Sequence, residues 1–217
     1  RARFGRMAAG RLIEMIEKSS VIGVAWGRTI RSLVNGIEAS RQPIDRSQPI
    51  EFAAVCAELV ALAQHEYSSS RLADALDQAF NGTSGNAAQL TGFPAYIPRH
   101  YDKKMRASIW RFISDTPGHH RVFSGADALI NQMDMLITSV GSSNMPILGS
   151  FEELVVAGGL TADELRRLVV GDLGGILIPR EGLSTAGEKL IEDLNSIWTG
   201  IKTEHVRAMV IRAIENP

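Results

Sequence analysis

The stretch that decides the fold is VIGVAWGRTIRSLVNGI, residues 21–37. Its first five residues are apolar and predict a short buried strand. A turn with Gly27 follows, and apolar residues then recur at the spacing of one helix face, at Ile30, Leu33, Val34 and Ile37. A strand, a glycine turn and a helix in this order indicate an α/β protein.

Outward from this stretch, apolar runs alternate with amphipathic helical patterns. Further strands are predicted at residues 50–56 and 135–140, and helices at residues 9–16, 70–81, 103–114, 126–132, 190–194 and 206–214. The run at 135–140 is apolar on both faces, which is typical of a parallel sheet covered on both sides. We therefore predict one α/β domain over residues 1–217, with a Rossmann-like, mostly parallel sheet and helices on both faces.

Helix-capping residues mark two of these helices. Ser70 is expected to cap the helix that stops near Asn81-Gly82. Thr161 and Glu164 form a capping box that predicts another helix start. The glycine-rich segment 83–92 between them is expected to be a loop, with residues 86–90 as one helical turn in the alternative.

The composition limits what the chain can do by itself. With 23 basic and 24 acidic residues the net charge is −1, so no overall positive field attracts nucleic acid or an anionic membrane. The one cysteine, Cys56, excludes an intrachain disulfide and lies in an apolar run, where a packing role is expected. No apolar run approaches the ~20 residues of a membrane-spanning helix. We expect a soluble, cytoplasmic domain, and any contact with DNA would require another domain.

The turn after the first predicted strand is the first candidate binding segment. Gly27 allows a ligand to approach the backbone closely, and Arg28 and Thr29 offer a cation and a hydroxyl at the start of a helix. Free N–H groups at a helix start attract anions, so phosphate is the expected ligand. An ordinary strand-to-helix turn explains the same residues about as well.

Two further segments carry polar groups beside apolar runs. In residues 139–144, Ser139, Gly141 and Ser142 offer hydroxyl and backbone partners for a sugar or a phosphate, or belong to an unliganded surface loop. Asp172, between glycines and apolar runs, is expected to be partly desolvated and to need hydrogen-bond donors, either ligand hydroxyls or backbone N–H groups. Ligands of open α/β sheets bind beyond the carboxyl ends of strands, and all three segments are candidates for that position.

The remaining polar and aromatic residues do not predict a catalytic or metal site. The five histidines lack partners at metal-ligand spacing and are expected to be solvated or to cap helices. Glu152 and Glu153 are expected on an exposed helix face, and Trp26, Trp110 and Trp198 in the core or in a pocket wall. We expect no metal, no cofactor and no catalytic residue.

Several motifs together resemble the sugar-binding domain of SorC-family transcriptional regulators, within the wider fold of ribose-5-phosphate isomerase, glucosamine-6-phosphate deaminase and CoA transferases. The most specific is IGVAWGRTI, residues 22–30, which is similar to the family's Gly-x-x-Trp-Gly-Arg-Thr-Leu motif. Residues 8–12, 134–141, 170–175 and 198–205 resemble further family segments. This chain has Ser139-Val140-Gly141 where the family often has Gly-Ile-Gly.

The resemblance implies a ligand sensor. Gly27, Arg28 and Thr29 would hold the phosphate of a phosphorylated sugar, with Gly141, Ser142 and Asp172 near the sugar itself. Family proteins carry an N-terminal helix-turn-helix domain, expected upstream of Arg1, and a strand region, expected beyond Pro217, that contributes a lysine to the site. Effector binding would shift the arrangement of DNA-binding domains in a homo-oligomer, a dimer or a tetramer, and so control genes of carbohydrate metabolism.

Two other functions fit the same residues. A sugar-phosphate isomerase or deaminase of this fold would need a base near its substrate, and Asp172 is the attractive candidate. A non-binding oligomerisation scaffold is the other alternative, because many of the predicted helices are apolar. The sequence favours the sensor over both.

Overall fold

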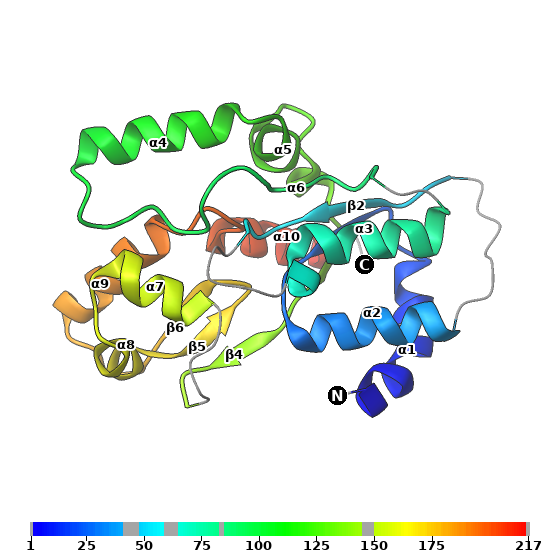
Figure 1. Ribbon diagram of the computed structural model, residues 1–217, viewed down its shortest axis with the longest axis horizontal. Coiled ribbons are helices and arrows are strands. Elements are labelled where there is room, and N and C mark those ends of the chain that lie inside the picture. The colour runs from blue at the N-terminus through cyan, green and yellow to red at the C-terminus, as the bar shows by residue number, and fades with distance from the viewer. Residues whose placement is uncertain (1, 41–47, 59–64, 83–84, 145–149, 216–217) are drawn as a thin grey trace.

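Two small sheets lie side by side at the centre of the protein, with helices around them (Figure 1). The computed structural model describes residues 2–40, 48–58, 65–82, 85–144 and 150–215. The first sheet is parallel and contains, in spatial order, β2 (Glu51–Ala54), β1 (Val21–Val24) and β3 (Met135–Ile137). The second is antiparallel and contains β4 (Val140–Ser142), β5 (Val169–Leu173) and β6 (Ile176–Pro179). The predicted α/β class is confirmed.

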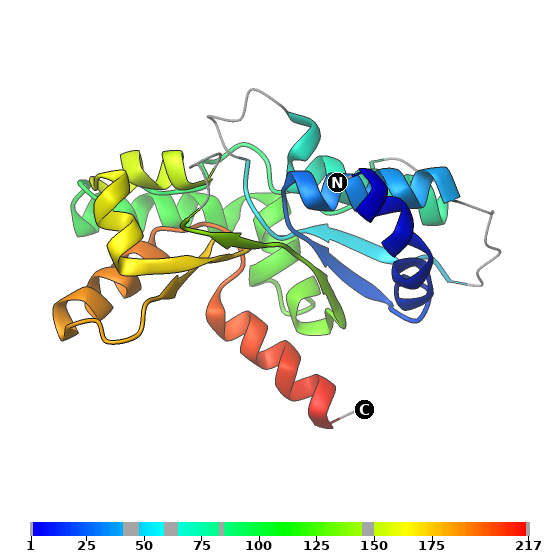
Figure 2. The ribbon, with the colours of Figure 1, turned by 90° about the horizontal axis from the view of Figure 1, so that it is seen from below.

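The helices follow the sequence pattern closely. They are α1 (Ala2–Ile16), α2 (Arg28–Ser40), α3 (Ser69–Asn81), α4 (Lys103–Asp115), α5 (Pro117–His119), α6 (Leu129–Gln132), α7 (Ser150–Gly158), α8 (Ala162–Leu168), α9 (Thr185–Ser196) and α10 (Thr203–Glu215), with a 3₁₀ turn η1 (His65–Tyr67) and a π turn η2 (His120–Ser124). Figure 2 shows α2 and α3 on one face of the parallel sheet and α6 on the other. The expectation of helices on both faces is confirmed for this sheet. None of the described helices combines the length and the apolar content that crossing a membrane requires.

The parallel sheet forms where the decisive stretch predicts it. All four residues of β1 are buried, and Ile22 at its centre pairs with Phe52 of β2 and Met135 of β3. Buried apolar residues of both sheets and their helices form one continuous cluster. At β1, burial of both strand faces explains why the sequence there is apolar without alternation.

The start of α3 differs from its prediction. Ser68, not Ser70, is the N-cap, since its hydroxyl accepts a hydrogen bond from the Arg71 N–H at 3.2 Å. Ser70 lies inside the first turn, and its hydroxyl accepts from the Leu90 N–H at 3.2 Å. The loop expected after this helix is confirmed from Gly85 onward, because Ala88 forms a parallel bridge to Ala53 instead of a helical turn.

The apolar run at residues 135–140 belongs to both sheets. It was predicted as one buried strand, yet β3 ends at Ile137 and β4 begins at Val140. The backbone passes from the first sheet into the second at Thr138 and Ser139, and Val140 is 72% exposed. Segment 139–144 is therefore partly strand rather than loop, because Gly141 and Ser142 pair with β5.

The predicted parallel sheet is present, and the second, antiparallel sheet is an addition that the sequence did not predict. The glycine-bracketed aspartate segment was expected as a third loop at a strand end, but Asp172 lies within β5, and only Gly174 and Gly175 form the turn to β6. Both glycines have positive φ, 57° and 93°, which suits a two-residue hairpin turn. This turn makes the two apolar runs antiparallel neighbours.

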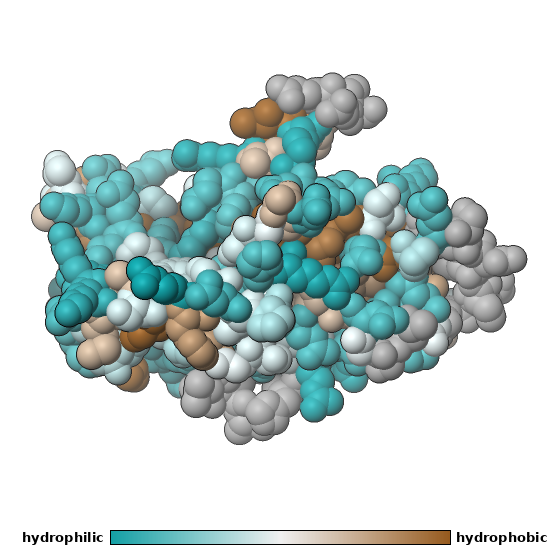
Figure 3. All heavy atoms as spheres, turned by 90° about the horizontal axis from the view of Figure 1, so that it is seen from above, coloured by the Kyte–Doolittle hydropathy of each residue, from teal (hydrophilic) through white to brown (hydrophobic). Residues whose placement is uncertain are grey.

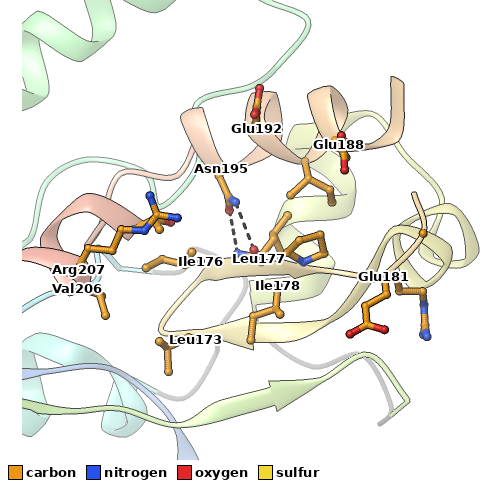
Figure 4. Close-up of a pocket in the computed structure, with 15 residues that line it drawn as sticks. Leu173, Ile176, Leu177, Ile178, Glu181, Glu188, Glu192, Asn195, Val206 and Arg207 are labelled. Atoms are coloured by element: carbon orange, nitrogen blue, oxygen red, sulfur yellow. Dashed lines mark hydrogen bonds between the residues drawn. The ribbon is translucent and has the colours of Figure 1, made fainter. Parts of the chain in front are cut away.

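A side-chain amide occupies the outer edge of β6. The Leu177 N–H donates to Asn195 Oδ1 at 2.8 Å, and Asn195 Nδ2 donates to the Leu177 carbonyl oxygen at 3.3 Å (Figure 4). Because Asn195 lies on α9, this pair fixes α9 against the strand. It also occupies backbone groups through which an edge strand could pair with another strand.

Candidate ligand-binding site

The turns after β1 and β3 meet at the edge of the parallel sheet. Gly27 has a φ of 135°, a conformation that residues with side chains rarely adopt. A Cβ atom placed on Gly27 would lie 3.4 Å from Ser139 Oγ, so the two turns are in contact. The structure therefore brings together the first two predicted segments at the carboxyl ends of neighbouring parallel strands.

The third segment reaches the same place from the second sheet. A Cβ atom on Gly174 would lie 3.1 Å from Thr138 Oγ1 and 3.8 Å from Ala25 Cβ. Asp172 pairs with Gly141 across β4 and β5, and its Oδ1 atom lies where a side chain of Gly141 would be, 2.0 Å from an added Cβ. Residues from three distant parts of the sequence are thus joined by pairwise contacts near the ends of β1 and β3.

Asp172 is a buried carboxyl group. Its residue is 7% exposed, and burial raises the pKa of the carboxyl, an effect that the hydrogen bond from Gly175 opposes. The Gly175 N–H donates to Asp172 Oδ2 at 3.0 Å. The sequence left two kinds of donor open, ligand hydroxyls and backbone N–H groups. At Asp172 Oδ2 the structure has a backbone N–H.

Arg28 and Thr29 lie in the first turn of α2, as predicted, and both are exposed. The first turn of a helix leaves backbone N–H groups without intrahelical acceptors, and in the described part of the chain nothing accepts from the N–H groups of Arg28 and Thr29. Gly27 differs, because its N–H donates to the Tyr67 carbonyl oxygen at 3.0 Å. The N–H groups available to an anion therefore begin at Arg28.

Ser142 does not lie with Gly141 and Asp172. Successive side chains of a strand point to opposite faces, so Ser142 and Gly141 face opposite sides of β4. Ser142 is exposed, and its hydroxyl accepts from the Asn144 N–H at 3.3 Å. The structure groups Gly27 with Ser139 and Gly141 with Asp172, and leaves Ser142 outside the group.

Three residues at this position were not among the predicted ligand contacts. Thr138 and Tyr67 contact the turns as described, and the Trp26 indole Nε1 is buried. Trp26 was expected in the core or a pocket wall, and its place in the Trp-Gly-Arg-Thr motif was the available signal. Thr138 and Tyr67 carried no such signal, because their positions depend on tertiary packing.

Cys56 lies directly behind the hairpin turn. It is 1% exposed, and its thiol donates to the Gly174 carbonyl oxygen at 3.4 Å. Burial raises the pKa of the thiol, and the negative charge of Asp172 adds to that rise. A neutral, buried thiol suits the packing role that the sequence predicted.

A cavity of about 800 Å³ lies on the other side of β5 (Figure 4). Apolar side chains of the hairpin form its floor, and residues of α9 and α10 form its walls. Leu173 lines this cavity, and strand alternation directs its side chain away from the face that carries Asp172. The cavity is therefore separate from the polar site.

Solved structures with the same architecture are transcriptional regulators. A DeoR family transcriptional regulator from Listeria monocytogenes matches with a TM-score of 0.60 and 19% identity, over 94% of this chain and 69% of that protein. The probable sor operon regulator from Shigella flexneri matches with 0.52 and 17%, over 82% of this chain and 61% of that protein. The full-length sorbitol operon regulator SorC from Klebsiella pneumoniae matches with 0.55 and 21%, over 80% of this chain and 50% of that protein. This chain shares its fold with these three proteins over the matched residues.

At the level of the fold, the resemblance to SorC-type regulators is confirmed. The chain spans between 50% and 69% of the length of those three proteins. No protein-family model and no curated protein matches the sequence.

Proposed function

We propose that this chain is the effector-binding domain of a SorC-type transcriptional regulator and that its effector is a phosphorylated sugar. The observation that carries the proposal is the meeting of three motif segments at one edge of the parallel sheet. Gly27 contacts Ser139, and Asp172 lies against Gly141 while its turn contacts Thr138. The regulator fold supports the same function.

The phosphate binds at the start of α2 in this proposal. The N–H groups of Arg28 and Thr29, the Thr29 hydroxyl and the Arg28 guanidinium are the donors. Charge-assisted hydrogen bonds from arginine and from a helix start are strong, because the partial positive charge of the helix end adds to that of the guanidinium.

The sugar lies toward Asp172. A carboxylate accepts hydrogen bonds from sugar hydroxyls, and the buried position of Asp172 strengthens each such bond. Gly141 leaves room for this carboxylate. Ser139, which contacts Gly27, supplies a hydroxyl between the start of α2 and Asp172 in this proposal.

The response to the effector is a population shift in the proposal. An effector that binds one arrangement of the domain more tightly favours that arrangement and thereby the geometry of DNA-binding domains outside residues 1–217. The full regulator acts as a homo-oligomer on genes of carbohydrate metabolism.

Thermal-shift measurement tests the proposal. Pentose 5-phosphates and hexose 6-phosphates are each compared with the same sugar without phosphate. A ligand that binds only the folded state stabilises it by about 2.7 kcal/mol at a concentration of 100 Kd, so the melting temperature rises with concentration. The proposal expects this rise for at least one phosphorylated sugar and not for its parent sugar. No rise with any phosphorylated sugar would favour the scaffold.

A sugar-phosphate isomerase or deaminase is the second candidate function. The raised pKa of Asp172 is the observation that favours it, since a buried carboxyl group can act as a general acid or base. Turnover of a sugar phosphate that disappears in Asp172→Asn would establish the enzyme. The sensor proposal expects the same ligands to bind without turnover.

A further inference from the structure

We propose that α10 is the output element of this domain and that its position is coupled to the state of the Asp172 carboxylate. This inference rests on the proposed function, because it assigns a readout to the site described there. The coupling runs through the β5–β6 turn and the segment between α9 and α10.

The first step is the hold of Asp172 on the hairpin turn. Its carboxylate accepts the Gly175 N–H at 3.0 Å, next to the two glycines with positive φ. A ligand hydroxyl that donates to the same carboxylate draws on the same negative charge and so weakens its bond to the Gly175 N–H. Occupancy of the site therefore changes the hydrogen bond that fixes the turn.

The second step is the contact between the turn and Trp198. A Cβ atom on Gly175 would lie 2.4 Å from Trp198 Cζ2, so no side chain fits between the ring and the turn. Trp198 is 1% exposed, and its indole N–H donates to the Ile201 carbonyl oxygen at 3.1 Å. The Ile201 N–H in turn donates to the Val55 carbonyl oxygen at 2.8 Å. A shift of the turn displaces Trp198 and strains these bonds, because the core around the ring is closely packed.

The third step joins this segment to α10. The Lys202 N–H donates to His205 Nδ1 at 3.1 Å, within the first turn of the helix. The Lys202 ammonium donates to the carbonyl oxygens of Asn195, at 3.0 Å, and of Trp198. The His205 ring stacks on Phe123 with 5.3 Å between ring centroids. The start of α10 is thus joined to Trp198 through Lys202.

The helix itself projects from the rest of the protein (Figure 2). Its Arg212 guanidinium donates to the carbonyl oxygens of Ile130 and Met133 at 3.1 and 2.9 Å. Figure 3 shows apolar side chains on the projection. Val210, Ile211 and Ile214 are 55%, 54% and 73% exposed. A change in the direction of α10 therefore changes the apolar surface that the domain presents.

The coupling can be measured without a ligand, by changing Asp172 and observing α10. Hydrogen exchange followed by mass spectrometry compares the unliganded protein with Asp172→Ala, which leaves the Gly175 N–H without its acceptor. We expect amides of residues 203–210 to exchange about three- to tenfold faster in the variant, and amides of α1 to exchange at an unchanged rate.

The matched control is Asp102→Ala, which removes another carboxylate that accepts a backbone N–H, that of Met105 at 2.8 Å, at the start of α4. We expect no change in α10 there. The inference is overturned if, in Asp172→Ala, amides of the β5–β6 turn exchange faster while amides of α10 exchange at the rate of the original protein.

A second variant covers the case in which Asp172→Ala does not fold. Trp198→Phe retains a ring and removes the donor to Ile201, so α10 is expected to exchange faster while α1 is unaffected. If amides of α10 in Trp198→Phe exchange at the rate of the original protein, the coupling is also contradicted. Neither hydrogen-exchange experiment includes a sugar phosphate. The two experiments therefore test the coupling separately from ligand binding, which the thermal-shift experiment tests.

Discussion

Gly141 has no side chain, and this leaves room for the Asp172 carboxylate in the candidate site. The carboxylate of Asp172 fills the space beside Gly141, and the Gly175 N–H holds it there. A polar group buried in this way destabilises the fold unless its hydrogen bonds are made. The position of the carboxylate therefore depends on the residue at 141.

Gly141→Ala is expected to move that carboxylate. The new Cβ atom would lie 2.0 Å from Asp172 Oδ1, so the side chain must shift and lose its bond to Gly175. We expect a loss of about 1–3 kcal/mol in the free energy of unfolding, measured by urea denaturation. Gly10→Ala in α1 is the control, because among the described residues no atom outside its own helix backbone lies within 4 Å of the added Cβ, and it should be neutral or stabilising. Equal effects of the two substitutions would contradict the account.

Arg28→Ala tests the phosphate end of the site. We expect affinity for a phosphorylated sugar to fall about tenfold or more, because a charge-assisted hydrogen bond contributes about 1.5–3 kcal/mol. Affinity for the parent sugar should change much less. Isothermal titration calorimetry measures both, with Arg3→Ala, an exposed arginine of α1, as the control. Equal losses for the two ligands would remove the phosphate assignment.

At the scale of elements, Asn195 and the edge of β6 illustrate how a helix and a strand are joined. The amide makes both hydrogen bonds that the outer edge of β6 needs at Leu177, and α9 is oriented by them. Such a bond is made only when two distant segments meet, so the sequence alone did not predict it.

Asn195→Leu is expected to destabilise the protein by about 1–3 kcal/mol, because the N–H and carbonyl groups of Leu177 lose their partners. Urea denaturation measures the change. Asn35→Leu on the exposed face of α2 is the control and should lie within about 0.5 kcal/mol of the original protein. An equally small change in the free energy of unfolding for Asn195→Leu would show that the N–H and carbonyl groups of Leu177 find other hydrogen-bond partners.

Local signals predicted the elements better than their pairing. The capping box at Thr161 and Glu164 is present as expected, because it depends on residues three positions apart. The antiparallel hairpin was missed although Gly174-Gly175 between apolar runs is a hairpin signal. The division of residues 135–140 between two sheets had no local signal, since both halves are apolar.

The same holds for the candidate site. Arg28 and Thr29 could be placed at a helix start from their spacing, and their exposure agrees with that placement. The contacts of Gly27 with Ser139 and of Gly174 with Thr138 depend on how the two sheets meet. That geometry lies outside what periodicity can predict.

On the scale of the whole molecule, histidines link the helices that surround the two sheets. His119 was expected to be solvated or to cap a helix, but it is 6% exposed and lies among Phe93, Trp110 and Phe123. Its Nδ1 is 3.1 Å from Ser124 Oγ. Burial, with the nearby charge of Lys202, lowers the pKa of His119 from 6.5 to about 4.

This shift predicts a loss of stability in acid. The folded protein holds His119 neutral, so its contribution is complete above pH 6.5 and is lost as the pH falls toward 4. We expect His119→Phe to lose less stability than the original protein between pH 7 and pH 5 in urea denaturation. Some loss should remain, because burial also lowers the pKa of His205. Identical pH profiles would exclude His119 as the cause.

The passage of one backbone run from β3 directly into β4 has a mechanical consequence. Because only Thr138 and Ser139 separate the strands, a rotation of the second sheet against the first changes the dihedral angles of those two residues. Ser139 contacts Gly27, so a ligand bound at the Gly27 turn would lie directly against this two-residue connection.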